Sequence, residues 1–406
     1  MKGVNRSICL LVIFFVLNLP CLVSGADYNI TQSMDFTGPY AVIMKSVDAA
    51  SRVVYTWWNE TVGSKLGIKL HFKPYETRYD PSVVASLWPG ILSGDKPIAH
   101  AGLGGPDLAA LMKRLPRDKV PMMMSTAAAG FMWAPNQWIF LFRPTYTHEH
   151  AAFLKWYKNK FIKDRPLRFA VISSQAGPMY VDFVNGYKKF MEKADWIDFV
   201  SVEWVDMKPV SILSEMRRLS RKKLDIIAAG ANTAHALSAI KAQKELGIHI
   251  PLLMASHSGI QMCALASGDM KLLEGHYDAY ACDPAIDMNV PGARVYEEYR
   301  EKLGIKNRWL LMGAQASAQA VLICRAVERA AAKVGADNIT GEAMYKAMYE
   351  KPFTEEEMLG LTHRLEYTKE SPFPQKGLKV RITTVKNGKQ ILATKKWMPV
   401  VDIPKW

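Results

Sequence analysis

Residues 30–41 read ITQSMDFTGPYA, and residues 42–62 follow as a long run with apolar side chains at helical spacing. A β-branched opening, a polar turn containing Gly-Pro and an apolar helical run predict a strand that ends in a loop at a helix N-terminus. Loops at the carboxyl ends of parallel strands collect at one sheet edge, where helix N-termini offer unpaired N–H groups. The stretch therefore predicts either an ordinary βα turn or the first wall of a ligand site.

The same order of strand, loop and helix recurs along the chain. The predicted strands are residues 68–75, 98–101, 120–125 and 140–146 in a first half, and 168–173, 199–205, 224–229, 251–255 and 275–281 in a second half. Two consecutive βαβ halves predict two α/β lobes whose loops face a shared cleft. The tail differs, because residues 361–367 and 379–385 resemble antiparallel strands, and Asn387-Gly388 is a hairpin turn.

The first 26 residues have the pattern of a signal peptide. Lys2 and Arg6 form a basic start, residues 8–19 are apolar, and small residues at 24–26 suit a signal peptidase. The apolar run is too short to span a bilayer as a helix, and no later run is long enough. We therefore expect an exported, periplasmic protein.

Composition favours a globular protein, with 49% hydrophobic and 22% charged residues among 406. The formal charge of +14 falls to about +12 without Lys2 and Arg6, which favours anionic solutes or surfaces. Basic residues are scattered among acidic ones, and this distribution argues against a nucleic-acid partner.

Five cysteines are present, and Cys9 and Cys21 fall in the leader. Export permits a disulfide, and Cys263 with Cys282 is the expected pair because each lies beside a strand of one βαβ unit. Cys324 lies in the helical run 314–333 and is expected as a buried apolar residue. No Cys or His cluster has metal-ligand spacing, and we expect no cofactor.

Groups that could support catalysis are sparse. Serines end several predicted strands, but none lies in a Gly-x-Ser-x-Gly turn. Gly102-Leu103-Gly104-Gly105 lacks the further glycine of a dinucleotide loop and the lysine of a phosphate loop. Asp35 is interpreted as a turn or capping residue. His257 faces the expected cleft or is a satisfied histidine, and both readings remain open.

Aromatic side chains lie near several predicted loop ends, where they can wall a partly apolar ligand or pack in the core. The candidates carried forward as ligand contacts are Phe36, Tyr40, Tyr180 and Tyr280. A cleft with hydroxyls, backbone N–H groups and aromatic rings, but no activated group, indicates binding rather than catalysis.

The order of these pieces resembles the substrate-binding proteins of ABC importers of the branched-chain amino acid and amide type, which have the type I periplasmic binding fold. The residues that carry the resemblance span nearly all of the mature chain: 36–41, Asp80-Pro81, 98–105, 121–129, 142–145, 169–177, Gly186-Tyr187, 225–230, 360–362 and 385–389.

That resemblance implies two doubly wound, Rossmann-like α/β lobes joined by a three-strand hinge, with a solute trapped between them. The first lobe would hold residues 27–146 and 283–354, and the second 147–282 and 355–406. It also implies an ABC permease as partner, a monomer, and no enzymatic step. The alternatives are a ligand sensor that signals to a protein and, less favoured, an exported hydrolase.

Family members that take amino acids hold the carboxylate with hydroxyls and backbone N–H groups, matched here by Gly104, Ser125 and Thr126. They hold the ammonium with an acidic residue after the strand that ends here at Ala255. This chain has Ser256-His257-Ser258-Gly259 there and an uncharged loop around Asn232, so an ammonium group would lack its partner. We therefore expect a ligand with an acid or amide end and an apolar or aromatic body.

Overall fold

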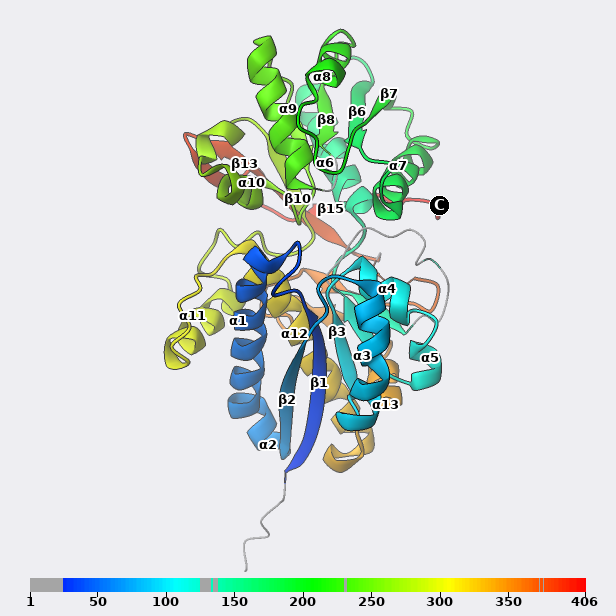
Figure 1. Cartoon of the computed structure of the whole chain (residues 1–406), viewed down its shortest axis with the longest axis vertical. Helices are drawn as coiled ribbons and strands as arrows, with labels where there is room; N and C mark the ends of the chain where they lie inside the picture. Colours follow the sequence, from blue (N-terminus) through cyan, green and yellow to red (C-terminus); the bar gives the residue numbers. More distant parts are fainter. Residues whose placement is uncertain (1–24, 125–132, 134–137, 230–231, 372, 375) are drawn as a thin grey trace, which may run out of the picture.

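Two β-sheets, each covered by helices on both faces, form two lobes stacked along the long axis of the molecule (Figure 1). The computed structural model describes residues 25–124, 133, 138–229, 232–371, 373, 374 and 376–406. Most of the predicted signal peptide lies outside the described residues. The prediction of two α/β lobes is confirmed.

The first sheet has five strands in the order β2-β1-β3-β4-β5, and every neighbouring pair is parallel. Its strands are β1 (Ala26–Met34), β2 (Ile68–Glu76), β3 (Ala99–Gly102), β4 (Met122–Met124) and β5 (Ile139–Leu141).

Helices cover both faces of this sheet. They are α1 (Ala41–Trp58), a π-helical turn (Asn59–Gly63), α2 (Ser64–Leu66), α3 (Pro81–Gly94), α4 (Gly105–Leu111), α5 (Leu115–Asp118), α11 (Pro291–Lys302), α12 (Leu311–Val334), a 3₁₀ turn (Ala336–Asn338) and α13 (Gly341–Ala347). The alternation of β4 shows the two faces: Met123 packs in the cluster of α1 and α12, whereas Met122 and Met124 pack in the cluster of α3 and α4.

The second sheet runs β14-β13-β10-β9-β8-β6-β7 with β15 paired to β13. Its strands are β6 (Leu167–Ser173), β7 (Ile197–Trp204), β8 (Ile226–Ala229), β9 (Leu252–Met254), β10 (Tyr277–Tyr280), β13 (Lys379–Lys386), β14 (Lys389–Leu392) and β15 (Met398–Pro399). Strands β6 to β10 are parallel, and the predicted antiparallel hairpin turns at Asn387 and Gly388, which have φ of 54° and 68°.

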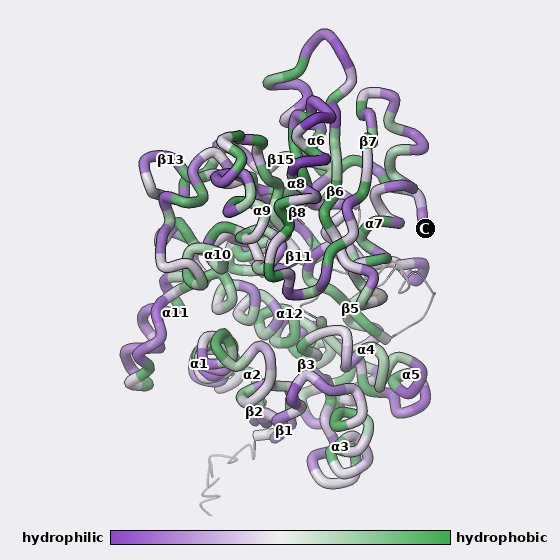
Figure 2. The backbone as a smooth tube through the Cα atoms, turned by 45° about the horizontal axis from the view of Figure 1, so that its top comes forward, coloured by the Kyte–Doolittle hydropathy of each residue, from purple (hydrophilic) through white to green (hydrophobic). Residues whose placement is uncertain are grey.

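Helices α6 (Tyr146–Phe161), α7 (Pro178–Met191), α8 (Leu213–Ser220), α9 (Thr233–Leu246) and α10 (Ile260–Ser267) surround this sheet, with a 3₁₀ turn at Met270–Leu273. Phe169 and Val171 of β6 face one hydrophobic cluster, and Ala170 and Ile172 face the other. Hydrophobic residues follow α12 in the interior, whereas the outer helix α11 is mostly hydrophilic (Figure 2).

The chain passes between the lobes three times: from β5 into α6, from β10 into α11, and from the small pair β11 (Phe353–Thr354) and β12 (Arg364–Leu365) into β13. Two of these crossings lie side by side, because Cys282 pairs with Thr362 and the Asp283 N–H donates to the Leu361 carbonyl at 2.7 Å. Three crossings between two lobes, two of them side by side, fit the geometry of a hinge.

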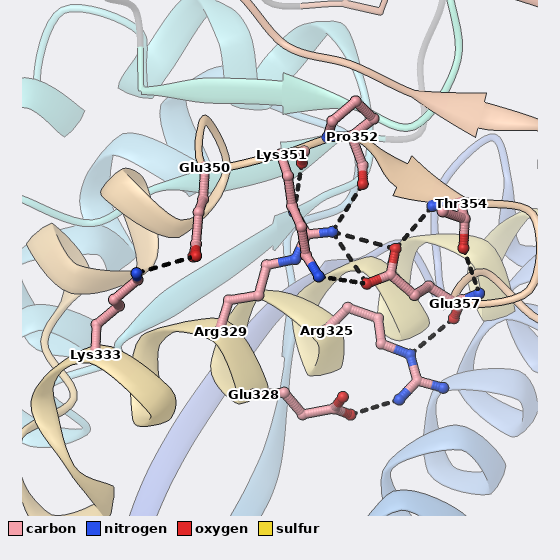
Figure 3. A network of polar contacts seen from close by, with 9 residues as sticks. All are labelled: Arg325, Glu328, Arg329, Lys333, Glu350, Lys351, Pro352, Thr354 and Glu357. Carbon is pink, nitrogen blue, oxygen red and sulfur yellow. Dashed lines mark hydrogen bonds and ion pairs between the residues drawn. The ribbon is translucent and has the colours of Figure 1, made fainter.

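Residues that follow Thr354 remain with the first lobe for some distance. Arg329 of α12 donates to the carbonyls of Lys351 and Pro352 and to the Glu357 carboxylate, and Arg325 donates to the Glu357 carbonyl (Figure 3). The side chains of Met358, Leu361, Leu365 and Tyr367 join the same core as α12. The β11–β12 pair therefore packs with the core of the first lobe.

The expected disulfide is absent, and this prediction is wrong. Cys263, Cys282 and Cys324 are free and buried. Cys263 packs in the cluster of α8 and α9, and Cys282 packs in the first-lobe cluster. Neighbourhood in a βαβ unit did not bring the two thiols together, because they belong to different cores.

We expect a thiol reagent to leave the folded chain unmodified and to titrate all three thiols after unfolding in denaturant without reductant. Burial excludes the reagent and raises the pKa of Cys263 to about 12, so little thiolate forms near neutral pH. The measurement is absorbance after addition of an aromatic disulfide to protein that lacks residues 1–26. A single equivalent after unfolding would show that a bridge forms.

Within the part of the chain that the structure describes, no helix has the length and apolar character needed to cross a bilayer.

Candidate functional site

A cavity of about 390 Å³ lies between the two lobes. The first lobe contributes Pro39, Tyr40, Val42, Ile43, Tyr79, Leu103 and Met312. The second lobe contributes Tyr146, Met179, Tyr180, Asn232, Thr233, His257, Ser258, Met262, Leu265 and Ala266. Both lobes therefore contact anything that occupies the space, as a cleft that closes around a solute requires.

The first-lobe wall begins with the loop before α1. The buried carboxylate of Asp35 accepts the N–H groups of Gly38 and Tyr40, each at 2.7 Å, so Asp35 is the turn residue that the sequence predicts. A side chain at Gly38 would collide with that carboxylate. The loop holds the Tyr40 ring edge-on to Tyr79, with centroids 4.5 Å apart.

Tyr180 and Asn232 form part of the second-lobe wall. The Asn232 side chain caps α9 by accepting the His235 N–H at 2.8 Å. Its amide nitrogen donates to the Met207 carbonyl at 3.1 Å and to the Tyr180 hydroxyl at 3.3 Å. Capping therefore fixes the amide, and the amide in turn orients the Tyr180 phenol.

His257 marks the polar part of the cavity. Arg143, which is completely buried after β5, donates from Nη2 to Nε2 of His257 at 2.8 Å, and the Tyr146 hydroxyl contacts Nδ1 of the same ring. Burial and the neighbouring guanidinium lower the pKa of His257 well below its usual value. The imidazole is therefore neutral near pH 7, and its ring nitrogens already have partners in Arg143 and Tyr146.

Two buried carboxylates hold the loop that carries His257. The Ser256 hydroxyl donates to Glu149 at 2.6 Å, and Glu149 also accepts the Ala281 N–H at 2.9 Å and lies 3.7 Å from Arg143. On the other side, Asp278 accepts the Ile260 N–H at 2.8 Å at the start of α10. Burial raises the pKa of Glu149 against the lowering effect of Arg143.

Only some of the predicted site residues line the cavity. Tyr40, Tyr180, Asn232 and His257 line the cavity. Ser125 and Thr126 lie outside the described residues. Phe36 is exposed, and its N–H donates to Glu76 at 2.7 Å.

Two further predicted site residues do not line the cavity. Gly104 is the N-cap residue that precedes α4, and its N–H donates to the Asp107 carboxylate at 3.0 Å. Tyr280 is fully buried, with its hydroxyl donating to Asp278. Its place near a strand end suggested the cleft, but the strand turns this ring into the first-lobe core.

Sequence reasoning missed Tyr79, Tyr146 and Arg143 as site residues. Tyr79 has a φ of 53° in the turn after β2, and this conformation, which is rare for a bulky residue, holds its ring at the cavity. Arg143 directly follows a buried apolar strand. A cation at that position is unusual enough to have been a usable signal.

The sequence profile of the periplasmic binding protein family matches residues 28–389, and the chain belongs to this family. Its architecture is the type I periplasmic binding fold of branched-chain amino acid receptors. No curated protein matches the sequence significantly.

Several solved structures share this fold at low sequence identity. A branched-chain amino acid ABC transporter protein from Thermus thermophilus with bound valine is 17% identical, with a TM-score of 0.77 over 93% of this chain and 97% of that one. A fatty acid ABC transporter substrate-binding protein from Thermomonospora curvata is 18% identical, with a TM-score of 0.73 over 92% and 95%. A solute-binding protein from R. palustris in complex with benzoate is 15% identical, with a TM-score of 0.71 over 94% and 99%.

Proposed function

We propose that this protein is an exported receptor that captures a small solute by lobe closure and delivers it to an ABC permease in the inner membrane. Family membership and a cavity walled by both lobes support this role. The signal-peptide pattern of residues 1–26 supports a periplasmic location. The receptor acts as a monomer and catalyses no reaction.

The ligand that fits best has a carboxylate or amide end and an aromatic or aliphatic body. The observation that carries this proposal is the lining: four tyrosine rings and several aliphatic side chains, with no Asp or Glu among the described lining residues. An α-ammonium group sealed in this cavity would lose its hydration without gaining a carboxylate partner. Such a loss typically costs about 2–5 kcal/mol of binding free energy.

The buried ion pair between Arg143 and Glu149 also favours an anionic ligand over a cationic one. Arg143 contacts His257, which lines the cavity, whereas Glu149 contacts Ser256 and Ala281, which do not. Charge is felt more strongly away from bulk water, so the nearer guanidinium favours a ligand with negative charge. The structural neighbours with benzoate and with fatty acids in their descriptions are in line with an acid, and the neighbour with valine defines the competing ligand class.

We expect aromatic or aliphatic acids, but not leucine or valine, to raise the melting temperature of protein that lacks residues 1–26. A ligand specific for the folded state adds about 2.7 kcal/mol at a hundredfold excess over its dissociation constant. The measurement is a thermal-shift screen on protein unfolded and refolded to remove carried-over ligand, followed by calorimetry. Micromolar leucine binding without acid binding would overturn the ligand class, and no response to any solute would favour a protein-partner sensor.

The same calorimetry on Tyr180→Ala localises the binding. Truncating a tyrosine that packs on the ligand typically costs about 2 kcal/mol or more, which is roughly thirtyfold in affinity. Phe161→Ala is the matched control, because this aromatic ring is 46% exposed at the far end of α6 and does not line the cavity. Equal affinities of the two variants would place the ligand elsewhere.

A further inference from the structure

Two groups of residues in the cavity lining differ in chemistry. In the polar group, His257 and Tyr146 form a hydrogen-bonded pair backed by Arg143. In the other group, hereafter the apolar end, the first turn of α1 and one side of α10 bring together aliphatic and thioether side chains: Val42, Ile43, Met262, Leu265 and Ala266. A ligand that satisfies both groups carries a polar group on an apolar body.

The apolar end opens to solvent. Val42 of the first lobe and Leu265 of the second both line the cavity, yet their side chains are 78% and 56% exposed. In Figure 1, α10 of the upper lobe lies above the N-terminal end of α1. Large aliphatic residues that are partly in a cavity and partly in water form an apolar mouth, hereafter the Val42–Leu265 mouth.

This mouth is not simply the gap of two separated lobes. On the α4 side of the cleft, Met179 of the second lobe reaches Gly105 of the first, since a Cβ placed on Gly105 would lie only 3.1 Å from Met179 Sδ. Arg143 also contacts Ser256 and His257 at the hinge. The lobes therefore touch on the other side while the Val42–Leu265 mouth stays open.

We propose that the ligand is an elongated amphipathic acid, whose carboxylate lies toward His257 and whose apolar tail runs along Met262 and Ile43 and leaves through the Val42–Leu265 mouth. The proposal rests on the solute-binding function proposed above and narrows its substrate class. A sealed cavity of about 390 Å³ would impose a strict upper size limit, whereas an open apolar mouth lets the tail lengthen without a clash.

The test is a chain-length series of straight-chain monocarboxylates from butanoate to dodecanoate, measured by calorimetry below their micelle concentrations. We expect affinity to rise by about fourfold for each methylene that is buried against the apolar end. Methylenes that extend beyond the mouth lie in water both in the free acid and in the complex. The affinity should therefore level off with chain length rather than fall.

Variants locate the tail. The double variant Val42→Gln with Leu265→Gln should flatten the gain for the longer acids and leave the shorter acids unchanged, because only the longer tails reach these side chains. Glutamine is chosen because its uncharged side chain has no long-range electrostatic effect on the carboxylate of the ligand. Leu303→Gln with Val334→Gln is the control, since these aliphatic residues are also exposed, at 41% and 39%, and do not line the cavity.

The outcomes separate the two proposals. An affinity that peaks at a short acid and drops at least tenfold for longer ones would overturn the open-mouth assignment while leaving the solute receptor intact. A chain-length gain that the mouth variant leaves unaltered would overturn the proposed path of the tail. Failure of every acid in the series to bind would overturn the proposed ligand class itself.

Discussion

Replacing Arg143 by methionine is expected to lower the free energy of unfolding by about 3–5 kcal/mol and to abolish solute binding. The guanidinium is completely buried, contacts Ser256 and His257, and lies 3.7 Å from the equally buried Glu149. Without it, Glu149 is left without its cationic partner in a site that already disfavours its charge. The loop that places His257 in the cavity loses its contact with the hinge.

A second substitution distinguishes a lost charge partner from simple cavity formation. Adding Glu149→Gln to Arg143→Met removes the unpaired charge and should recover a large part of the lost stability, since neutral replacements of buried ion pairs are often well tolerated. Urea unfolding of the four combinations gives the coupling energy. The control is Arg52→Met, which breaks an exposed pair with Asp48 on α1 and should cost about 0.5 kcal/mol or less. A loss below 1 kcal/mol for Arg143→Met would contradict the prediction.

The contribution of Asp278 to the free energy of unfolding is expected to decrease as the pH rises from 4 to 7. Burial, opposed by hydrogen bonds from Thr383, Tyr280 and the Ile260 N–H, raises the pKa of Asp278 from 3.8 to about 7. The folded chain therefore holds a proton that the unfolded chain releases near pH 4, and the stabilisation present below pH 4 is lost by about pH 7. The free energy at stake is about 4 kcal/mol.

The measurement is the difference in unfolding free energy between wild type and Asp278→Asn at several pH values. Asparagine does not titrate, so contributions from groups that do not interact with Asp278 cancel in the difference. The difference should fall through the pH window from 4 to 7. Glu274→Gln is a control of opposite sign: the N–H groups of Gly388 and Asn387 lower the pKa of Glu274, so that residue stabilises above about pH 4.5 and less at lower pH. A flat Asp278 difference would contradict the prediction.

Local patterns were sufficient to predict the architecture. The repeated order of strand, loop and helix gave both lobes, because buried parallel strands are short apolar runs and each is followed by an amphipathic helix. Asp35 and the Asn387-Gly388 turn were also identified correctly, since each acts through its own neighbouring backbone. These features depend on contacts within a few residues.

The site depends on contacts between distant residues, and this is where sequence reasoning stopped. Arg143 meets Ser256 and His257 across more than a hundred residues. Nothing local indicates which core Cys282 enters or that Tyr280 points away from the cleft. Tyr40, Asn232 and His257 lie in or beside loops at the cavity, as the sequence predicts. The residues that orient their side chains come from other elements, and tertiary packing brings them together.

The three crossings between the lobes also constrain the order in which the chain becomes foldable. The strands of the first sheet are all synthesised by Leu141, but α12, which fills the core on one of its faces, is complete only at Val334, after β6 to β10. On that face α1 has no α12 to pack against while most of the second lobe emerges. The first lobe therefore reaches its native packing only late in synthesis.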